Sequence, residues 1–552
     1  MSGAGLWRLS NAKTGNVHSS CIYFETDGLK RRIQVKNTER QRNWISRMRL
    51  ARASAVLALA TVLVSAVITP QPAQAQTLTT LYNFCSQTNC TDGGGSFEGL
   101  VQATNGNFYG TTHFYGAYNG GTVFKITPSG ALTTLYIFCT QAACTDGDYP
   151  TGTLVQATNG DFYGTTASGG ANVACLPGCG TVFKISPSGT LTTLYSFCSQ
   201  QFCTDGSSPT GLIQAANGNL YGTTAYNGAN AAGTFFTITP TGMLTTLYSF
   251  CSMRSCADGG FPQAGLVQAT NGDFYGTTEE GGTSASCFGG CGTVFKITAS
   301  GALTTLYSFC SQQSCADGYY PEASLVQATN GNFYGTTLCG GAVAGLNCDS
   351  STSSGGTVFK ISSGGTLTTL YSFCSQSGCT DGSFPQAGLV QATDANLYGT
   401  TVFGGANNDG TIFKITPSGA LTTLQSFDGF GQGLDGERPY AGLIQGTNGD
   451  FYGTTYAGGA SNGGTVFSLS VGLKAFVETQ PTSGKVRAAV KILGTNLTGA
   501  TSVTFNGTSA TFTVVSRSEI TTTVPTGATT GPVEVITPRG TLKSNTEFRV
   551  TP

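Results

Sequence analysis

The chain has 552 residues, of which only 10% are charged against about 25% in an average soluble protein, and it contains 79 glycines. Residues 76–552 carry 15 Lys and Arg against 24 Asp and Glu, a net charge of −9. This balance argues against a protein that binds nucleic acid, because such binding depends on Lys and Arg that neutralise phosphates.

Residues 1–75 predict a leader with an export signal. The apolar run 53–69 follows several arginines and ends near Ala73-Gln-Ala75, a small-x-small cleavage pattern. The run is short for a membrane span, so we expect cleavage after Ala75 and no transmembrane anchor in the mature chain. The basic residues before Met48 are unlike a signal peptide, and we expect translation to start at Met48.

A unit that contains Leu-Thr-Thr-Leu occurs seven times between Leu78 and Leu421, at spacings of 53 to 64 residues. A period of this length predicts a repeat architecture. In the second unit, four short segments rich in Val, Ile, Thr, Tyr and Phe predict β-strands: 153–157, 162–166, 180–185 and 191–197.

Two tight turns are predicted within each unit. Asn159-Gly160 lies between the first and second strands and suits a two-residue primed hairpin turn, in which both central residues have positive φ. Pro187-Ser188-Gly189 marks the reversal between the third and fourth strands.

Four antiparallel strands repeated seven times predict an all-β fold, a seven-bladed β-propeller over residues 78–471. The seventh unit has only three strands of its own, so we expect the strand at 78–84 to complete it and close the ring. The first, inner strand of each blade is predicted to begin near one of seven residues: Gly99, Thr153, Gly211, Gly265, Ser324, Gly388 and Gly442.

All 18 cysteines after the leader fall into close pairs, and even pairing in an exported chain predicts disulfides. The alternative is metal binding, which needs pairs that converge with histidines, whereas His113 is the only histidine after the leader. The predicted pairs are Cys85/Cys90, Cys139/Cys144, Cys175/Cys179, Cys198/Cys203, Cys251/Cys256, Cys287/Cys291, Cys310/Cys315, Cys339/Cys348 and Cys374/Cys379.

Strand alternation places every cysteine pair and nearly all variation in loop length on one face of the predicted propeller. The opposite face has only the two kinds of tight turn. Because binding sites commonly lie in variable loops on a rigid scaffold, we expect the disulfide-bearing loop face to bind the ligand.

An aspartate precedes glycine at the same place in all seven units. These carboxylates are candidate calcium ligands. The alternative is a turn in which the carboxylate accepts local backbone N–H groups, and a feature shared by all seven units favours the turn over a single active site. The residues are Asp92, Asp146, Asp205, Asp258, Asp317, Asp381 and Asp435.

Other candidate ligand-binding residues occur in one unit only. Paired carboxylates such as Glu279, Glu280 and Glu322 are able to hydrolyse glycosidic bonds at suitable separations, although solvated loop acids are the plainer interpretation. His113 lies beside Tyr115 and is the only histidine available as a base. We assign no catalytic residue and no cofactor apart from the calcium alternative.

The unit Asn-Gly-Asn/Asp-Phe-Tyr-Gly-Thr-Thr, followed by Gly-Thr-Val-Phe-Lys-Ile and Leu-Thr-Thr-Leu-Tyr-Ser-Phe, resembles the GloVer tandem repeat of bacterial choice-of-anchor proteins. It is also loosely similar to kelch blades. Asp394-Ala395 departs from Asn-Gly, and a cysteine-free loop follows Phe427. The resemblance implies a surface or secreted propeller and brings no catalytic residues.

Residues 473–552 lack the repeat and resemble an IPT/TIG domain through segments such as 490–497 and 531–535. The resemblance implies an immunoglobulin-like β-sandwich that acts as a spacer or adhesion module. We therefore expect a secreted or cell-surface, non-enzymatic protein that holds an extracellular glycan or protein on its loop face. The alternative is a glycoside hydrolase or lyase that uses loop carboxylates.

Overall fold

The computed structural model describes residues 76–551, except 173, 176–177, 216, 342–347, 349–354 and 430–433. The expected leader, the start at Met48 and the cleavage site after Ala75 lie outside the described residues. None of the helices formed by the described residues has the length and apolar character needed to cross a membrane.

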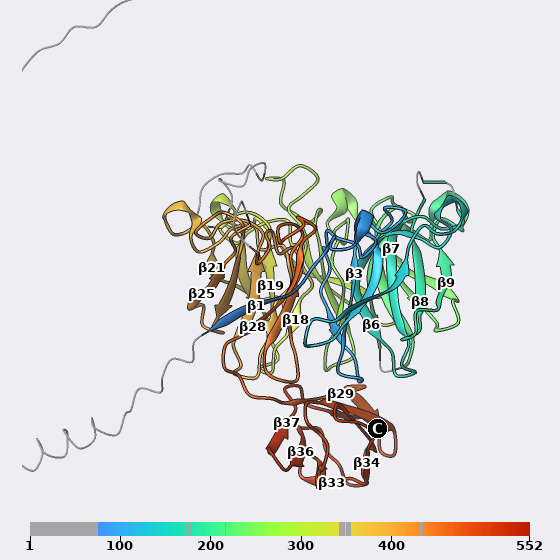
Figure 1. Cartoon of the computed structure of the whole chain (residues 1–552). Helices are drawn as coiled ribbons and strands as arrows, with labels where there is room; N and C mark the ends of the chain where they lie inside the picture. Colours follow the sequence, from blue (N-terminus) through green and yellow to red (C-terminus); the bar gives the residue numbers. More distant parts are fainter. Residues whose placement is uncertain are drawn as a thin grey trace, which may run out of the picture. The chain divides into compact units, whose positions relative to one another are not determined.

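The repeat region folds into four-stranded antiparallel sheets, so the prediction of an all-β repeat structure is confirmed (Figure 1). First strands are β2 (Val101–Gln102), β6 (Asp148–Gln156), β10 (Ser207–Gln214), β14 (Val267–Gln268), β18 (Val326–Gln327), β22 (Val390–Gln391) and β26 (Ile444–Gln445). Second strands are β3 (Phe108–Thr112), β7 (Phe162–Ser168), β11 (Leu220–Tyr226), β15 (Phe274–Thr278), β19 (Phe333–Thr337), β23 (Leu397–Thr401) and β27 (Phe451–Thr454).

The remaining two strands of each sheet follow in the same order. Third strands are β4 (Thr122–Ile126), β8 (Thr181–Ile185), β12 (Thr234–Ile238), β16 (Thr293–Ile297), β20 (Thr357–Ile361), β24 (Thr411–Ile415) and β28 (Thr465–Ser470). Fourth strands are β5 (Leu132–Ile137), β9 (Leu191–Ser196), β13 (Leu244–Ser249), β17 (Leu303–Ser308), β21 (Leu367–Ser372), β25 (Leu421–Ser426) and β1 (Thr77–Asn83).

The N-terminal strand β1 completes the last sheet. It pairs antiparallel with β28, from Thr77 opposite Ser470 to Asn83 opposite Thr465, and the sheet order is β1-β28-β27-β26. The chain ends of the repeat region therefore share one sheet, as the sequence predicts.

Neighbouring sheets pack face to face through their second strands. The ring of Tyr109 stacks on Phe162 of the next sheet with centroids 4.1 Å apart, and Phe108 packs on Tyr452 of the last sheet at 4.0 Å. The buried clusters each join two successive sheets, and one of them joins the sheet of β1 to the sheet of β2. This packing explains why the second and third strands are apolar or hydroxylic on both faces.

Two local predictions are wrong. The first strands were expected to begin near residues such as Gly99, but five of the seven ladders contain only two residues and begin later, at Val101 in the first sheet. We call the residues just before the Val-Gln or Ile-Gln pair of each repeat the lead-ins. They line a cavity; in five sheets they precede the first strand, and in the other two they are part of β6 and β10. The Asn159-Gly160 turn is not a primed turn, because only Gly160 has positive φ.

The observed turn follows from the asparagine side chain. Gly160 N–H donates to Ala157 O at 2.8 Å, and Asp161 N–H donates to Asn159 Oδ1 at 3.0 Å, which holds the asparagine outside the left-handed region. The result is a longer loop that ends on a glycine with positive φ.

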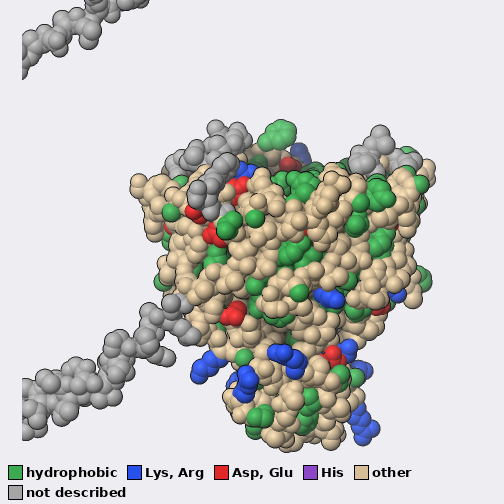
Figure 2. All heavy atoms as spheres, in the orientation of Figure 1, with side chains coloured by type: hydrophobic (Ala, Val, Ile, Leu, Met, Phe, Trp, Pro, Cys, Tyr) green, Lys and Arg blue, Asp and Glu red, His purple; other side chains and the backbone are tan. Residues whose placement is uncertain are grey.

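Six of the seven fourth strands, all except β25, are followed in the chain by a short 3-10 helix. These helices lie at the loop edge of the sheets in Figure 1. These helices are η1 (Thr88–Cys90), η2 (Ala142–Cys144), η3 (Gln201–Cys203), η4 (Arg254–Cys256), η5 (Gln313–Cys315) and η6 (Ser377–Cys379). Figure 2 shows that uncharged polar side chains and backbone cover most of the visible surface, as the 10% charged content leads one to expect.

The C-terminal residues form two four-stranded sheets and one two-stranded sheet around a separate core that contains Ile492, Phe505 and Phe548. The strands are β29 (Val477–Gln480), β30 (Ser483–Lys485), β31 (Ala489–Gly494), β32 (Ser502–Phe505), β33 (Thr508–Ser509), β34 (Phe512–Val514), β35 (Glu519–Thr523), β36 (Val533–Thr537), β37 (Gly540–Lys543) and β38 (Arg549–Thr551).

Candidate functional site

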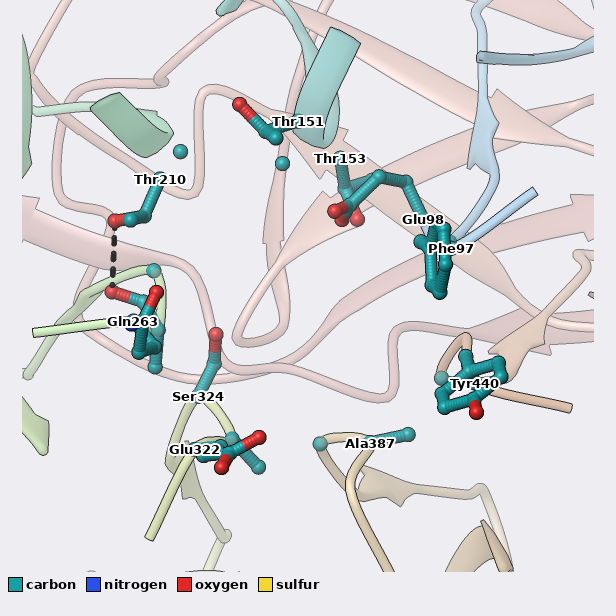
Figure 3. A pocket seen from close by; sticks show the side chains of 18 of the residues that line it. Phe97, Glu98, Thr151, Thr153, Thr210, Gln263, Glu322, Ser324, Ala387 and Tyr440 are labelled. Atoms are coloured by element: carbon teal, nitrogen blue, oxygen red, sulfur yellow. Dashed lines mark hydrogen bonds between the residues drawn. The ribbon is translucent and has the colours of Figure 1, made fainter. Parts of the chain in front are cut away.

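The lead-ins of all seven repeat sheets line one cavity of about 830 Å³, which we call the lead-in pocket (Figure 3). Small residues allow the lead-ins to come this close. A Cβ on Gly152 would lie 2.6 Å from the Cα of Gly211, and a Cβ on Gly442 would lie 3.1 Å from the carbonyl oxygen of Gly388. The volume lies within the range of about 300–1,000 Å³ that is typical of small-molecule sites.

One position of the repeat supplies a pocket residue from every sheet. It directly follows proline in six repeats and Ser96 in the first. Five residue types occupy this position, whereas the strands nearby are almost identical from repeat to repeat. The residues are Phe97, Thr151, Thr210, Gln263, Glu322, Gln386 and Tyr440.

Three carboxyl groups belong to the pocket lining: Glu98, Glu279 and Glu322. Burial raises the pKa of Glu98 to about 7, although a hydrogen bond from the backbone of Gly152 opposes the shift. Burial, with a smaller contribution from the charge of Glu279, also raises the pKa of Glu322 to about 7. Both groups therefore titrate near neutral pH.

Two of these carboxyl groups accept hydrogen bonds from neighbouring amides. Gln386 Nε2 donates to Glu322 Oε2 at 2.7 Å, and Gln263 Nε2 donates to Glu279 Oε2 at 3.0 Å. The Gln263–Glu279 bond lies within one sheet, and the Gln386–Glu322 bond joins the next two sheets along the chain. Each bond uses one oxygen of the carboxylate, which leaves the other oxygen for a ligand.

His113 is a half-buried member of the lining. Its Nδ1 donates to the carbonyl oxygen of Pro150 at 3.1 Å, because a carbonyl only accepts. Burial lowers the pKa of His113. The imidazole lies 5.0 Å from Phe97 and stacks on Tyr149 at 5.1 Å, so it extends an aromatic surface.

Two predicted candidates lie outside the pocket lining. Glu280 follows Glu279 directly but forms a bridge with Gly260 at the edge of the sheet, and burial raises its pKa. Tyr115 is 41% exposed, and its backbone N–H donates to Asn119 Oδ1 at 3.1 Å within its own loop. Glu279 and His113 line the pocket, whereas Glu280 and Tyr115, close to them in sequence, do not.

The pocket also contains residues that the sequence did not single out, above all Phe97, Gln263, Gln386 and Tyr440. Each follows the Asp-Gly turn in its own repeat. A comparison of the repeats position by position shows that the segment between the Asp-Gly turn and the Val-Gln or Ile-Gln of the first strand varies, and this position lies within that segment. That signal was present in the sequence.

Six of the seven repeated aspartates are fully buried, Asp435 is half-buried, and local hydrogen bonds occupy their carboxylates. Asp258, for example, accepts from the Tyr248 hydroxyl at 2.6 Å, from Ser252 N–H at 2.8 Å and from Met253 N–H at 3.0 Å. Burial raises its pKa, but the hydrogen bonds led by the one from Tyr248 outweigh burial and lower it overall. This geometry matches the turn interpretation.

The nine predicted cysteine pairs are joined by disulfides, at sequence separations of 4, 5 or 9 residues. Two pairs, Cys175/Cys179 and Cys198/Cys203, converge, with all four sulfurs within 4.8 Å of one another. No histidine belongs to this group among the described residues. In the disulfide form these sulfurs are not the thiolates that bind metal ions.

Cys348 forms the longest of these links, with Cys339, in the loop between β19 and β20. Cys339 is fully buried, and Cys348 is half-buried against the cluster that contains Tyr319. The residues on both sides of Cys348, 342–347 and 349–354, lie outside the described part of the chain, so the course of this loop does too.

The lead-ins lie in the same stretches of chain, between a fourth strand and the Val-Gln or Ile-Gln pair of the next sheet, that carry six of the cysteine pairs, and binding by the loop face stays a prediction. The described lining of the lead-in pocket contains no cysteine, and Cys348 in particular belongs to a hydrophobic cluster between two sheets. The lead-ins supply most of the lining because their small residues approach one another closely. Cys348 and the other cysteines therefore brace loops and do not form the candidate site.

A family model for the Gloeobacter/Verrucomicrobia repeat matches residues 66–288, 253–429 and 345–515, which together span most of the chain. The chain belongs to this family. The match confirms the resemblance to the GloVer repeat. It does not identify an IPT/TIG domain. No curated protein matches the sequence.

This Gloeobacter/Verrucomicrobia repeat protein is also similar to solved structures. Virginiamycin B lyase from Staphylococcus aureus is 14% identical with a TM-score of 0.45, and the match covers 72% of this chain and 99% of the lyase. The extracellular domain of a protein named as a putative hybrid two-component system from B. thetaiotaomicron is 11% identical with a TM-score of 0.43, covering 81% and 52%.

Proposed function

We propose that this protein is an exported, non-enzymatic binding protein that holds an extracellular glycan in the lead-in pocket. One observation carries the proposal: a single repeat position presents five residue types to one cavity, on sheets that are otherwise nearly identical. Strand pairing does not require this variety, because the strands themselves have nearly the same residues in every sheet. Specific contact with an asymmetric ligand does require it.

The proposed architecture is a seven-bladed propeller over residues 78–471, with an immunoglobulin-like IPT/TIG domain over 473–552 as a spacer. Support comes from the buried clusters, which lead from sheet to sheet and return to the first. Two four-stranded sheets around one core support the sandwich. The nine disulfides support export, because such bonds persist in oxidising compartments.

The second candidate function is a glycoside hydrolase or lyase. The observation in its favour is that Glu98 and Glu322 line the pocket with pKa values of about 7, which suits proton transfer at neutral pH. Binding remains the proposal because burial is the main cause of both shifts and needs no catalytic role to explain it.

One experiment separates the two functions. The mature protein, residues 76–552, is incubated with a panel of polysaccharides, and both retention and newly released reducing or unsaturated ends are measured. We expect saturable retention without product. Glu322→Gln is the test variant and Glu280→Gln the matched control, since Glu280 lies outside the lining. Turnover that Glu322→Gln abolishes and Glu280→Gln preserves would establish the enzyme instead.

A further inference from the structure

The lead-in pocket has two walls of different chemistry. The aromatic wall consists of Phe97, His113 and Tyr440, and the acceptor wall consists of Gln263, Glu279, Glu322 and Gln386. In Figure 3, Gln263 and Glu322 lie across the opening from Phe97 and Tyr440. Thr151 and Thr210, from the second and third sheets, lie between the two walls along the chain.

The aromatic wall is rigid because its rings pack on one another. The centroid of Phe97 lies 5.0 Å from those of both His113 and Tyr440, and Tyr456 supports the cluster from 4.9 Å. The ring planes are inclined to one another, by 85° between Phe97 and His113 and by 55° between Phe97 and Tyr440, so the wall offers separate ring faces. The face of an aromatic ring binds the apolar C–H face of a sugar ring and attracts cations.

The acceptor wall offers more acceptors than donors. Gln263 and Gln386 already use one amide hydrogen each on Glu279 and Glu322. Glu98 adds a third carboxyl group beside the aromatic wall, and each of these groups only accepts once it is ionised. No Lys or Arg belongs to the described lining. A ligand rich in donors and carrying positive charge complements this wall.

We propose that the pocket takes an amino sugar with a free, protonated amine, whose ring lies on the aromatic wall and whose ammonium group lies against the acceptor wall. This inference rests on the glycan-binding function proposed above and specifies its ligand. N-acetylation removes the charge and two of the N–H donors, and a uronic acid would place a carboxylate beside three others.

Binding of an ammonium group is coupled to proton release. With pKa values of about 7, Glu98 and Glu322 are mostly protonated at pH 6 in the free protein. A cation held beside them favours their ionised forms, so complex formation releases protons. A neutral sugar has no such effect, and this difference provides a readout other than affinity.

The test is calorimetric titration of the mature protein at pH 6 with four hexasaccharides: glucosamine, N-acetylglucosamine, glucose and galacturonic acid oligomers. We expect the glucosamine oligomer to bind about tenfold tighter or more than the acetylated one, the effect of a hydrogen bond to a charged group. Proton release is measured by repeating the titration in two buffers of different ionisation enthalpy.

Two variants assign the effect to the walls. Glu279→Gln should reduce the preference for the free amine, with Glu280→Gln as the matched control that leaves it unchanged. Tyr440→Ala should weaken all sugars to a similar extent. Equal affinity for the acetylated oligomer, or no proton release, would overturn the amino-sugar assignment while leaving glycan binding intact. Failure to bind any of the four oligomers overturns this inference, and retention of none of the polysaccharide panel overturns the proposed function itself.

Discussion

The strands of the repeat sheets and the lead-in pocket are built from the same repeats, yet their residues follow opposite rules. The third strand reads Thr-Val-Phe-Lys-Ile in four of the seven repeats, and its second and third residues are fully buried throughout. The lead-in residue that follows proline differs in nearly every repeat and faces the cavity.

This difference separates scaffold from site. A strand residue has the same neighbours in every sheet, so one side chain serves all copies. A lead-in residue meets open space and the lead-ins of other sheets, and nothing in the scaffold selects it. The comparison predicts that substitutions in the sheets change stability, whereas substitutions in the lead-ins change binding.

The largest expected effect is on the scaffold, through removal of β1. Deleting residues 76–85 leaves β28 without the partner that pairs with it from Thr465 to Ser470 and exposes a sheet edge. We expect the melting temperature to fall by about 10 °C or more, with aggregation, relative to the chain that begins at Gln76. Calorimetry or circular dichroism measures it, and an unchanged melting curve would mean that the ring is not closed by this strand.

The next effect is the loss of one turn carboxylate. Asp258→Ala leaves the Tyr248 hydroxyl and the N–H groups of Ser252 and Met253 without their acceptor in a buried turn. We expect about 3 kcal/mol of lost unfolding free energy. Gln263→Ala, in the lead-in of the same repeat, is the control and should cost less than about 1 kcal/mol. Equal losses in the two variants would contradict the separation of scaffold from site.

Much of this scaffold was predictable from the sequence, because turn residues, strand composition and the repeat period all act locally. The pairing of β1 with β28 was predicted because the seventh repeat has only three strands of its own. The cysteine pairs were predicted because all 18 cysteines after the leader fall into close pairs. The site was only partly predictable. Glu279 and Glu322 come together from different sheets, while Glu280 does not, and that outcome depends on the course of the loops that carry them.

The errors concern turn geometry and strand length. The Asn159 side chain accepts the N–H of Asp161, which selects a longer turn than the one that Asn-Gly favours. The first strands are short in five sheets, where the ladder contains only the Val-Gln or Ile-Gln pair, and long in β6 and β10, although the apolar pattern is similar in all seven. Neither feature is visible in composition or periodicity.

A smaller effect is expected from a single disulfide. The seventh loop, after β25, has no cysteines, yet Asp435 still accepts the N–H of Asp428 at 3.2 Å, so the turn forms without the bond. The double variant Cys85→Ser, Cys90→Ser should lose about 2 kcal/mol, the entropy of a short closed loop. Thermal unfolding measures this loss, and failure of the variant to fold would assign the disulfides a larger part in the scaffold.

The pH dependence of stability should differ in sign between the two regions. The lowered pKa of Asp258 means that its stabilisation is present above 3.8 and is lost as pH falls below that value. The raised pKa of Glu322 means that the folded state retains a proton that the unfolded chain releases above 4.5, so stability falls as pH rises toward about 7. Taken together, these two groups place maximal stability near pH 4, between 3.8 and 4.5. In Glu322→Gln the melting temperature at pH 8 should exceed that of the unmodified protein by a degree or so, and no difference would mean that the carboxyl is well solvated.

The smallest expected effect concerns calcium. Each of Asp92, Asp146 and Asp258 accepts hydrogen bonds from a tyrosine hydroxyl and from two successive backbone N–H groups, which occupy both carboxylate oxygens. A calcium ion would have to displace these donors, since N–H and O–H hydrogens point toward the positions where it would bind. Chelation with EDTA, followed by return of excess calcium, should leave the melting temperature unchanged. A fall that calcium reverses would show that the repeated aspartates bind the ion, and the scaffold would then depend on a metal as well as on its turns.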